Sequence, residues 1–148
     1  MREVMLLHAY FENTFGYLEH SDRADDALAA VRALEGDGLV EEIYTWRIGD
    51  EETEAPVDIV FDLRFLSFHI DHASRHTGLD EPIQRALAQH PQFASLMKRV
   101  RDEVRESGAH RIAFRCRHGK HRSVGFAELA RALLWPSAVV RHRRIKSS

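Results

Sequence analysis

Segments typical of strands alternate with segments typical of helices along almost the whole chain, and this alternation constrains the fold most. Strand-like segments, rich in β-branched and aromatic residues, span 3–11, 39–48, 57–66, 110–116 and 137–145. Helix-like segments, with an apolar stripe at helical spacing or clear end signals, span 21–38, 81–90, 91–108 and 122–135. Such alternation favours parallel strands with helices packed on the sheet. We therefore predict an α/β fold, a three-layer-like sandwich with a mostly parallel sheet.

The ends of two helices are marked by their flanking residues. Asp80 precedes segment 81–90 as a predicted N-cap, and Pro82 falls in the first turn of that helix. Gly108 follows segment 91–108 closely enough to end it in the left-handed conformation. Residues 67–80 show no period and are predicted to be a loop with at most a short helical turn.

Length and cysteine content limit the class of protein. The chain has 148 residues, of which 44% are hydrophobic, so we expect a single domain with a sizeable core. No apolar run approaches the ~20 residues of a membrane-spanning helix, and residues 1–17 are too short and polar for a signal peptide. The one cysteine, Cys116, cannot form an internal disulfide, which fits a reducing compartment. We therefore expect a cytoplasmic protein.

The charges are unevenly distributed although the net charge is only −2. Residues 1–60 carry 15 Asp and Glu against 4 Lys and Arg, whereas residues 111–148 carry 10 Lys and Arg against one Glu. Such asymmetry indicates an anionic partner for the basic end. Compensation between the two halves within the folded domain explains it equally well.

The loop between the strand-like segment 110–116 and the helix-like segment 122–135 has the features of an anion-binding site. The first N–H groups of a helix lack partners within the helix, and the helix dipole makes that end partly positive. In α/β sheets, ligands also bind where strands end. We predict a phosphate-binding loop here, with ligand contacts from Arg117, His118, Gly119, Lys120, His121, Arg122 and Ser123.

The same loop has the spacing Cys-x-x-Gly-x-x-Arg-Ser, which resembles the phosphate loop of cysteine-dependent phosphatases. That resemblance implies Cys116 as nucleophile and Arg122 as the clamp on the phosphoryl oxygens. A helix N-terminus and nearby cations lower the pKa of a thiol, which favours attack. Arg115 stands where those enzymes usually have histidine, however, and no acid is marked as the proton donor. The alternative is that Cys116 is a small, buried core residue.

Four ordered stretches resemble a more specific family. They are FDLRFL at 61–66, TGLD at 77–80, CRHGKHRSV at 116–124 and RHRRI at 141–145. Together they are similar to the C-terminal domain of the bacterial RNase adapter family RapZ. The resemblance covers residues 43–146, so residues 1–40 are an N-terminal extension outside it. No Walker-type glycine loop occurs, so the nucleotide-binding domain that precedes this domain in the family is not part of the sequence.

The resemblance implies a sensor or adapter domain of bacterial or phage origin. Family members bind a phosphorylated amino sugar, glucosamine-6-phosphate, and a small RNA, and they form oligomers. Carried over by position, Arg122 is the main phosphate clamp and His69 is a pocket residue. The resemblance places RNA contacts at Arg141, Arg143, Arg144 and Lys146. The bulky pair Arg117 and His118 replaces small residues of the family, which favours a more highly charged ligand, such as a nucleotide or polyphosphate.

Three further patterns have both a functional and a structural reading. His69, His72 and His76 have a spacing that suits a metal on a helix, but a polar pocket rim is the reading we adopt, with no metal and no cofactor. Asp62 and Arg64 share a face at the end of a strand, either lining the ligand site or forming a salt bridge. The basic end 141–146 either contacts RNA phosphates or protects the edge of the sheet.

Overall fold

The computed structural model describes residues 3–7, 23–36, 38–50, 56–64, 66 and 76–145. Five strands and four helices occur in this part of the chain. The strands are β1 (Glu3–Leu6), β2 (Glu42–Arg47), β3 (Ile59–Asp62), β4 (Arg111–Cys116) and β5 (Val139–His142). The helices are α1 (Arg23–Arg32), α2 (Glu81–Gln89), α3 (Phe93–Ser107) and α4 (Arg122–Leu133). Every strand and helix predicted from the sequence is therefore confirmed, with shorter bounds for most of them.

The strands form one sheet in the order β1-β3-β4-β2-β5, and all of its pairings are parallel. The predicted α/β class is confirmed, and the sheet is fully parallel where a mostly parallel one was expected. Because parallel strands all point the same way, their carboxyl ends meet at one edge of the sheet. The segments that follow β2, β3, β4 and β5 therefore begin side by side there.

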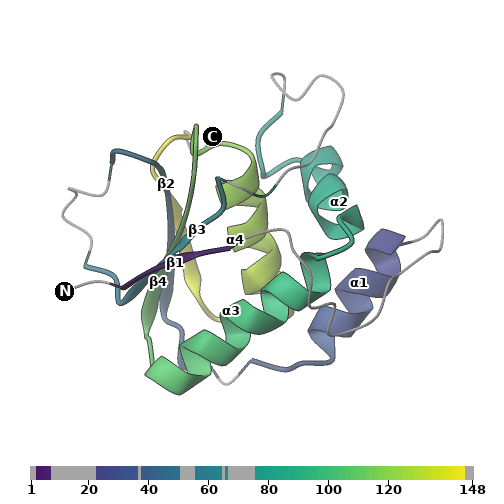
Figure 1. Ribbon diagram of the computed structural model, residues 1–148, viewed down its shortest axis with the longest axis horizontal. Coiled ribbons are helices and arrows are strands. Elements are labelled where there is room, and N and C mark those ends of the chain that lie inside the picture. Colours follow the sequence, from purple (N-terminus) through teal and green to yellow (C-terminus); the bar gives the residue numbers. More distant parts are fainter. Residues whose placement is uncertain are drawn as a thin grey trace.

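The described helices lie on one side of the sheet (Figure 1). Helix α4 packs against β2 and β4, α2 packs on α4, and α1 packs on α2 and α3. The sheet, the helices on it and the outer helix α1 thus form successive layers, consistent with a three-layer sandwich. The core between them includes Ile43, Phe61, Phe114 and Phe126, all fully buried. A smaller cluster of Trp46, Val57, Val60 and Ala113 lies on the opposite face of the sheet.

The described parts of residues 1–40 are built into the same core. Strand β1 pairs with β3 at the edge of the sheet. Helix α1 buries Ala24, Ala27 and Val31 against the neighbouring helices. A segment that lies outside the sequence resemblance thus supplies one edge strand and one covering helix.

Both predicted helix ends fall where expected, but one is capped differently. Gly108 is left-handed, with φ of 70°, and its N–H is donated to the carbonyl of Val104. Asp80 is the N-cap residue of α2, yet its side chain makes no cap hydrogen bond. Its carboxylate instead accepts the main-chain N–H of Thr77 at 2.8 Å, and so stabilises the turn before the helix. Within the described ranges, no helix is long and apolar enough to cross a membrane.

Candidate functional site

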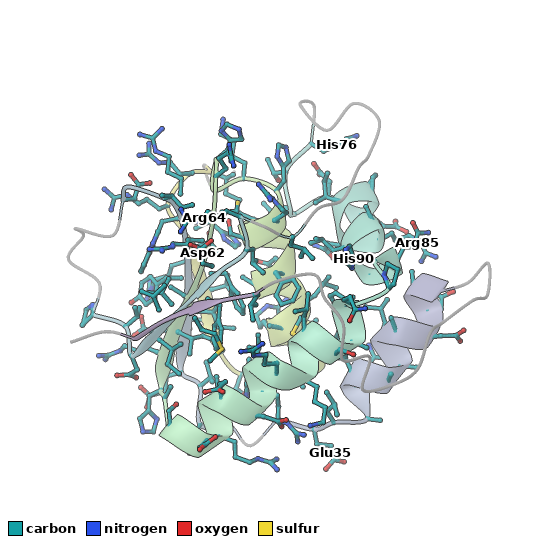
Figure 2. All side chains as sticks on the ribbon, in the orientation of Figure 1. Glu35, Asp62, Arg64, His76, Arg85 and His90 are labelled. Carbon is teal, nitrogen blue, oxygen red and sulfur yellow. The ribbon has the colours of Figure 1, made fainter. Side chains whose placement is uncertain are left out.

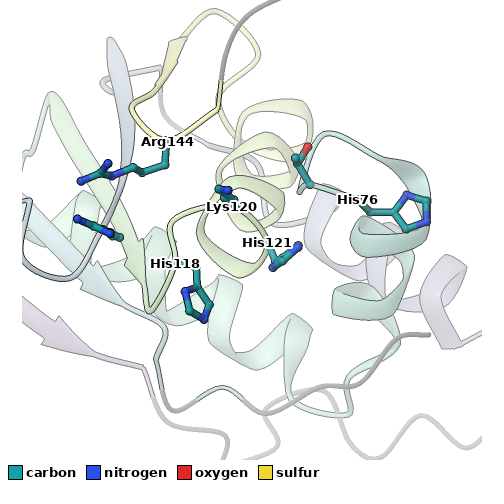
Figure 3. Close-up of a pocket in the computed structure, with 7 residues that line it drawn as sticks. His76, His118, Lys120, His121 and Arg144 are labelled. Carbon is teal, nitrogen blue, oxygen red and sulfur yellow. The ribbon is translucent and has the colours of Figure 1, made fainter. Parts of the chain in front are cut away.

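The carboxyl edge of the sheet carries a hollow of about 590 Å³. Its lining includes three cationic side chains, three histidines and one threonine: Arg47, Lys120, Arg144, His76, His118, His121 and Thr77. Figure 3 shows Lys120 between Arg144 on one side and His76 on the other. None of these seven described lining residues is an acid. As far as its described lining goes, the hollow therefore presents positive or neutral polar groups together with the carbon atoms of their side chains.

The loop 117–121 reaches the hollow because Gly119 packs tightly against the end of β2. Gly119 has φ of 71°, a conformation that side chains with a Cβ rarely adopt. A Cβ atom there would lie 2.8 Å from the nitrogen of Arg47 and 3.1 Å from Cγ of Arg144. Glycine is thus required both for the turn and for the close contact. The contact places Lys120 and His118 beside Arg47 and Arg144.

Asp50 contacts two arginines of the hollow, Arg47 and Arg144, without being a lining residue itself. It is only 8% exposed. Arg144 donates from both Nε and Nη2 to the two carboxylate oxygens, with Nε 2.6 Å from Oδ2. Nε of Arg47 lies 3.6 Å from Oδ1, and Nε of Arg143 lies 3.8 Å from Oδ2. The hydrogen bonds from Arg144 lower the pKa of Asp50 against the opposing effect of its burial. Asp50 therefore remains an ionised carboxylate at neutral pH.

Arg122, the predicted phosphate clamp, joins α4 to the segment after β3. Its Nη1 donates to the main-chain carbonyls of Leu63, Arg64 and Leu66 at 3.3, 2.8 and 3.1 Å. Arg122 is not among the residues that line the hollow. This guanidinium group thus holds the carboxyl end of β3 next to the first turn of α4, and any contact with an anion would use its other N–H groups.

Asp62 and Arg64 form the salt bridge that was one of the two predicted readings. The Asp62 carboxylate is fully buried and lies 3.3 Å from Nε of Arg64 (Figure 2). Arg115 donates from Nε to the same carboxylate at 2.9 Å, and its Nη2 also lies 2.9 Å from that carboxylate. The main-chain N–H of Arg64 adds a hydrogen bond to it at 3.0 Å. Asp62 at the end of β3 therefore binds Arg115 of β4. This link lies next to the main-chain carbonyls that accept hydrogen bonds from Arg122.

The thiol of Cys116 is buried, with only 2% of the residue exposed. Its Sγ lies 3.2 Å from the hydroxyl of Ser123, and it accepts the main-chain N–H of Ser123 at 3.4 Å. Ser123 is fully buried as well. In this conformation neither side chain faces the hollow, and the sulfur points into the first turn of α4. This burial is what the core reading of the cysteine predicts.

The TGLD segment forms the other wall of the hollow. The N–H of Gly78 donates to the carbonyl of Lys120 at 2.6 Å, and its own carbonyl accepts Nε2 of Gln84 at 2.8 Å. Nδ1 of His76 lies 3.4 Å from the Asp80 carboxylate. These contacts set His76 and Thr77 opposite the basic loop.

A partly buried chain of polar groups holds β5 against β2 and α4. Nδ1 of His142 lies 2.7 Å from Oγ1 of Thr45, and its Nε2 lies 2.7 Å from a carboxylate oxygen of Glu128. The hydrogen bond with His142 lowers the pKa of Glu128, while burial opposes the shift. Because Arg143 and Arg144 follow directly after β5, this chain helps to fix where they begin.

The structure brings some of the predicted site residues together and separates others. His118, Lys120 and His121 line the hollow, whereas Arg117 is exposed outside the lining. Arg141 is 61% exposed and lies 3.5 Å from Glu42, away from the hollow. Arg144, predicted as an RNA contact, lines the hollow instead. His69 and Lys146 lie outside the described residues.

Arg47 and Thr77 are lining residues that the sequence analysis did not select. Arg47 is the last residue of β2 and so lies at the same edge of the sheet as the loop after β4. Its position at the end of a predicted strand is the signal that could have found it. Among the described residues, no group of three or more His, Cys, Asp or Glu is arranged to hold a metal ion. His69 and His72 of the histidine pattern fall outside that part of the chain.

Comparison with known proteins adds a family and several relatives. Residues 43–146 match the RapZ C-terminal domain family. A nucleotide-binding protein of Rhodospirillum rubrum is 38% identical over 105 residues, covering 62% of this chain and 33% of that protein. A nucleotide-binding protein of Ruegeria is 39% identical over 103 residues, covering 60% of this chain and 34% of that protein. The chain thus spans about a third of the length of these curated relatives.

Proposed function

The chain belongs to the RapZ C-terminal domain family, and we propose that it is a sensor or adapter domain that binds a phosphorylated small molecule in the hollow. The observation that carries the proposal is the gathering of Arg47, Lys120 and Arg144 around one cavity at the carboxyl edge of a parallel sheet. Parallel α/β sheets bind ligands at this edge. Arginine and lysine are the side chains best suited to phosphate oxygens.

The histidines of the hollow add polar groups that suit a phosphate. His76, His118 and His121 line the same hollow as the three cations. A histidine ring has two nitrogens, of which at least one carries an N–H that donates to an oxygen. The hollow therefore offers hydrogen bonds to phosphate oxygens in addition to the charges of Arg47, Lys120 and Arg144.

We propose two classes of phosphorylated ligand, sugar phosphates and nucleotides. The family resemblance supports a sugar phosphate. The relatives named nucleotide-binding proteins are about twice as long as this chain, and their name supports a nucleotide for the whole protein. The gathering of Arg47, Lys120 and Arg144 at one hollow favours the more highly charged of the two classes. Phosphate is the chemistry that both classes share.

The test is a thermal-shift screen of the purified protein against inorganic phosphate, pyrophosphate, sugar phosphates and nucleotides, with sodium sulfate as a second anion. A ligand at about 100 times its Kd stabilises a protein by about 2.7 kcal/mol, a shift that is readily measured. Lys120→Gln should weaken binding of the best compound about tenfold, or ~1.4 kcal/mol. Lys98→Gln, on α3 beside Asp102, removes the same charge elsewhere and should leave binding unchanged.

Two results would contradict the proposal. One is the absence of stabilisation by every phosphorylated compound at millimolar concentration. The other is binding that Lys120→Gln leaves intact, since the ligand would then occupy a different part of the molecule. The same screen addresses the hydrolase alternative, because consumption of a phosphorylated compound by the wild type but not by Cys116→Ser would demonstrate a catalytic thiol.

RNA binding is a second proposed function, and the exposed arginines in and directly after β5 favour it. The side chains of Arg141 and Arg143 are 61% and 43% exposed. Lysine and arginine contacts to phosphates weaken as salt increases, with a slope that reflects their number. Arg141→Gln combined with Arg143→Gln should reduce RNA affinity at low salt and make this slope shallower. Unchanged affinity in the double variant would remove these residues from the interface.

Formation of homo-oligomers stays a prediction, which light scattering would test.

A further inference from the structure

A carboxylate directly behind an anion-binding hollow presents an electrostatic problem. The Asp50 carboxylate contacts both Arg47 and Arg144, the two arginines that line the hollow. By charge alone, a negative group at this place should weaken the binding of any anion. Asp50 would then be expected to lower the affinity of the proposed site.

The geometry of the Arg144 guanidinium group indicates the opposite effect. Asp50 accepts hydrogen bonds from Nε and Nη2, which form one edge of that planar group. A guanidinium group has five N–H donors, and the edge that carries Nη1 remains for a second oxyanion. Because the first edge is held at both ends, the second edge has a fixed direction. An arginine fixed in this way loses less side-chain entropy when it binds a ligand.

Asp50 also supports the surface on which the basic loop rests. Gly119 packs against the nitrogen of Arg47 and the Cγ of Arg144, at the close distances given above. The Asp50 carboxylate accepts the Arg47 main-chain N–H at 3.4 Å, and the Asp50 N–H donates to the Arg47 carbonyl at 3.1 Å. The turn 47–50, the stem of Arg144 and the loop 117–121 therefore form one packed unit around this carboxylate.

We propose that Asp50 is a positioning residue of the hollow: its carboxylate fixes Arg47 and Arg144 so that they bind an anion more tightly than they would without it. The inference rests on the proposed function, because it concerns the same hollow. The predicted effect on anion affinity is the opposite of the effect that net charge alone would have. Removing this negative charge should weaken the binding of an anion.

The test compares pyrophosphate affinity, measured by isothermal titration calorimetry, in four forms of the full chain. These are the wild type, Asp50→Asn, Asp50→Glu and Asp26→Asn. Asp26 is exposed on α1, so its substitution changes the net charge by the same amount without touching the turn 47–50. We expect affinity about tenfold weaker for Asp50→Asn, partial recovery for Asp50→Glu, and the wild-type value for Asp26→Asn.

Arg144→Lys keeps the proposal testable if Asp50→Asn does not fold. Lysine keeps the positive charge but cannot form the two-edged arrangement, so we again expect affinity about tenfold weaker. Where both variants fold, the double variant should lose less affinity than the sum of the two single losses, since the effect of Asp50 acts partly through Arg144. Wild-type affinity in Arg144→Lys would overturn the proposal.

The outcomes separate this inference from the proposed function. If the wild type binds pyrophosphate and Asp50→Asn binds it equally well or more tightly, the positioning role is wrong while the hollow remains the site. If the wild type binds neither pyrophosphate nor any other phosphorylated compound, the proposed function fails, and the role of Asp50 fails with it.

Discussion

Gly78 and Gly125 pack backbone against backbone, and this contact joins the TGLD segment to the first turn of α4. A Cβ atom on Gly78 would lie 2.0 Å from the nitrogen of Gly125 and 2.6 Å from the carbonyl oxygen of His121. Both atoms belong to the main chain, so no side chain can move aside to make room. The wall of the hollow formed by His76 and Thr77 depends on this contact.

Gly78→Ala should therefore destabilise the protein strongly. Forcing extra atoms into a packed site costs about 1–3 kcal/mol, and a clash with backbone falls at the upper end. Gly108→Ala is the matched control: a Cβ there meets nothing within 4 Å, and its φ of 70° costs about 1 kcal/mol. Urea unfolding of both variants gives the two free energies. Equal losses would show that the segment can retract from α4 at little cost.

Substitution of Arg122 separates its structural contacts from the phosphate-clamp role predicted from the sequence. Arg122→Ala leaves the carbonyls of Leu63, Arg64 and Leu66 without this donor, so we expect a loss of about 2–3 kcal/mol in unfolding free energy. Arg122→Lys, which keeps the charge and some donor capacity, should lose less. A variant Arg122→Ala that is as stable as the wild type but no longer binds phosphorylated compounds would show that the clamp role dominates.

The fold could be predicted because its signals are local. Segment 57–66 is apolar and β-branched before Asp62, and the stripe Phe93, Leu96, Met97, Val100 and Val104 that predicts α3 is buried as expected. Strand order has no such local signal, and β2 pairs with both β4 and β5 although neither is its neighbour in sequence. The hydrogen-bond partner of the Asp80 side chain could not be predicted either. Whether this side chain accepts the N–H of Thr77 or one in the helix depends on how the turn folds.

The site could be predicted only in part, because its main contacts join distant residues. The basic loop was visible in the sequence, and three of its side chains line the hollow. The bond between Asp50 and Arg144 spans 94 positions, and Asp50 is one of several acids in the segment 49–56. No sequence pattern marks Asp50, among the acids of this segment, as a partner of Arg144. Arg144 was for the same reason placed among RNA contacts rather than in the hollow.

The burial of Cys116 predicts a slow reaction with thiol reagents. A residue that is 2% exposed must open locally before Sγ can react. Each ~1.4 kcal/mol of opening free energy slows the reaction tenfold, so we expect at least about a 100-fold slower rate than in the unfolded chain. The measurement is the rate of labelling by a disulfide reagent with and without urea. Rapid labelling of the native protein would contradict the buried position and support the hydrolase alternative.

The bonds between His142 and Glu128 predict a loss of stability in acid. The pKa of Glu128 lies below its usual value of 4.5 in the folded protein, first because of the hydrogen bond with His142 and further because of His142 and Arg131 charges. A carboxyl group whose pKa is lowered by folding stabilises the folded protein at pH values above the pKa that the group has in the unfolded chain. That contribution disappears as the pH falls from about 4.5 through the folded value.

Glu128→Gln should remove this part of the acid sensitivity. The glutamine cannot titrate, so stability at neutral pH should fall, and the decline below pH 4.5 should become shallower by up to about 1.4 kcal/mol per pH unit. Urea unfolding at intervals between pH 6 and pH 3 measures the slope, with Glu106→Gln on the exposed face of α3 as the control for losing one carboxyl group. Equal slopes in wild type and Glu128→Gln would mean that Glu128 binds its proton equally well in the folded and unfolded chain. The hydrogen bond with His142 would then contribute nothing to the ionised form, and β5 would be held by its ladder with β2 and by Val140 in the core.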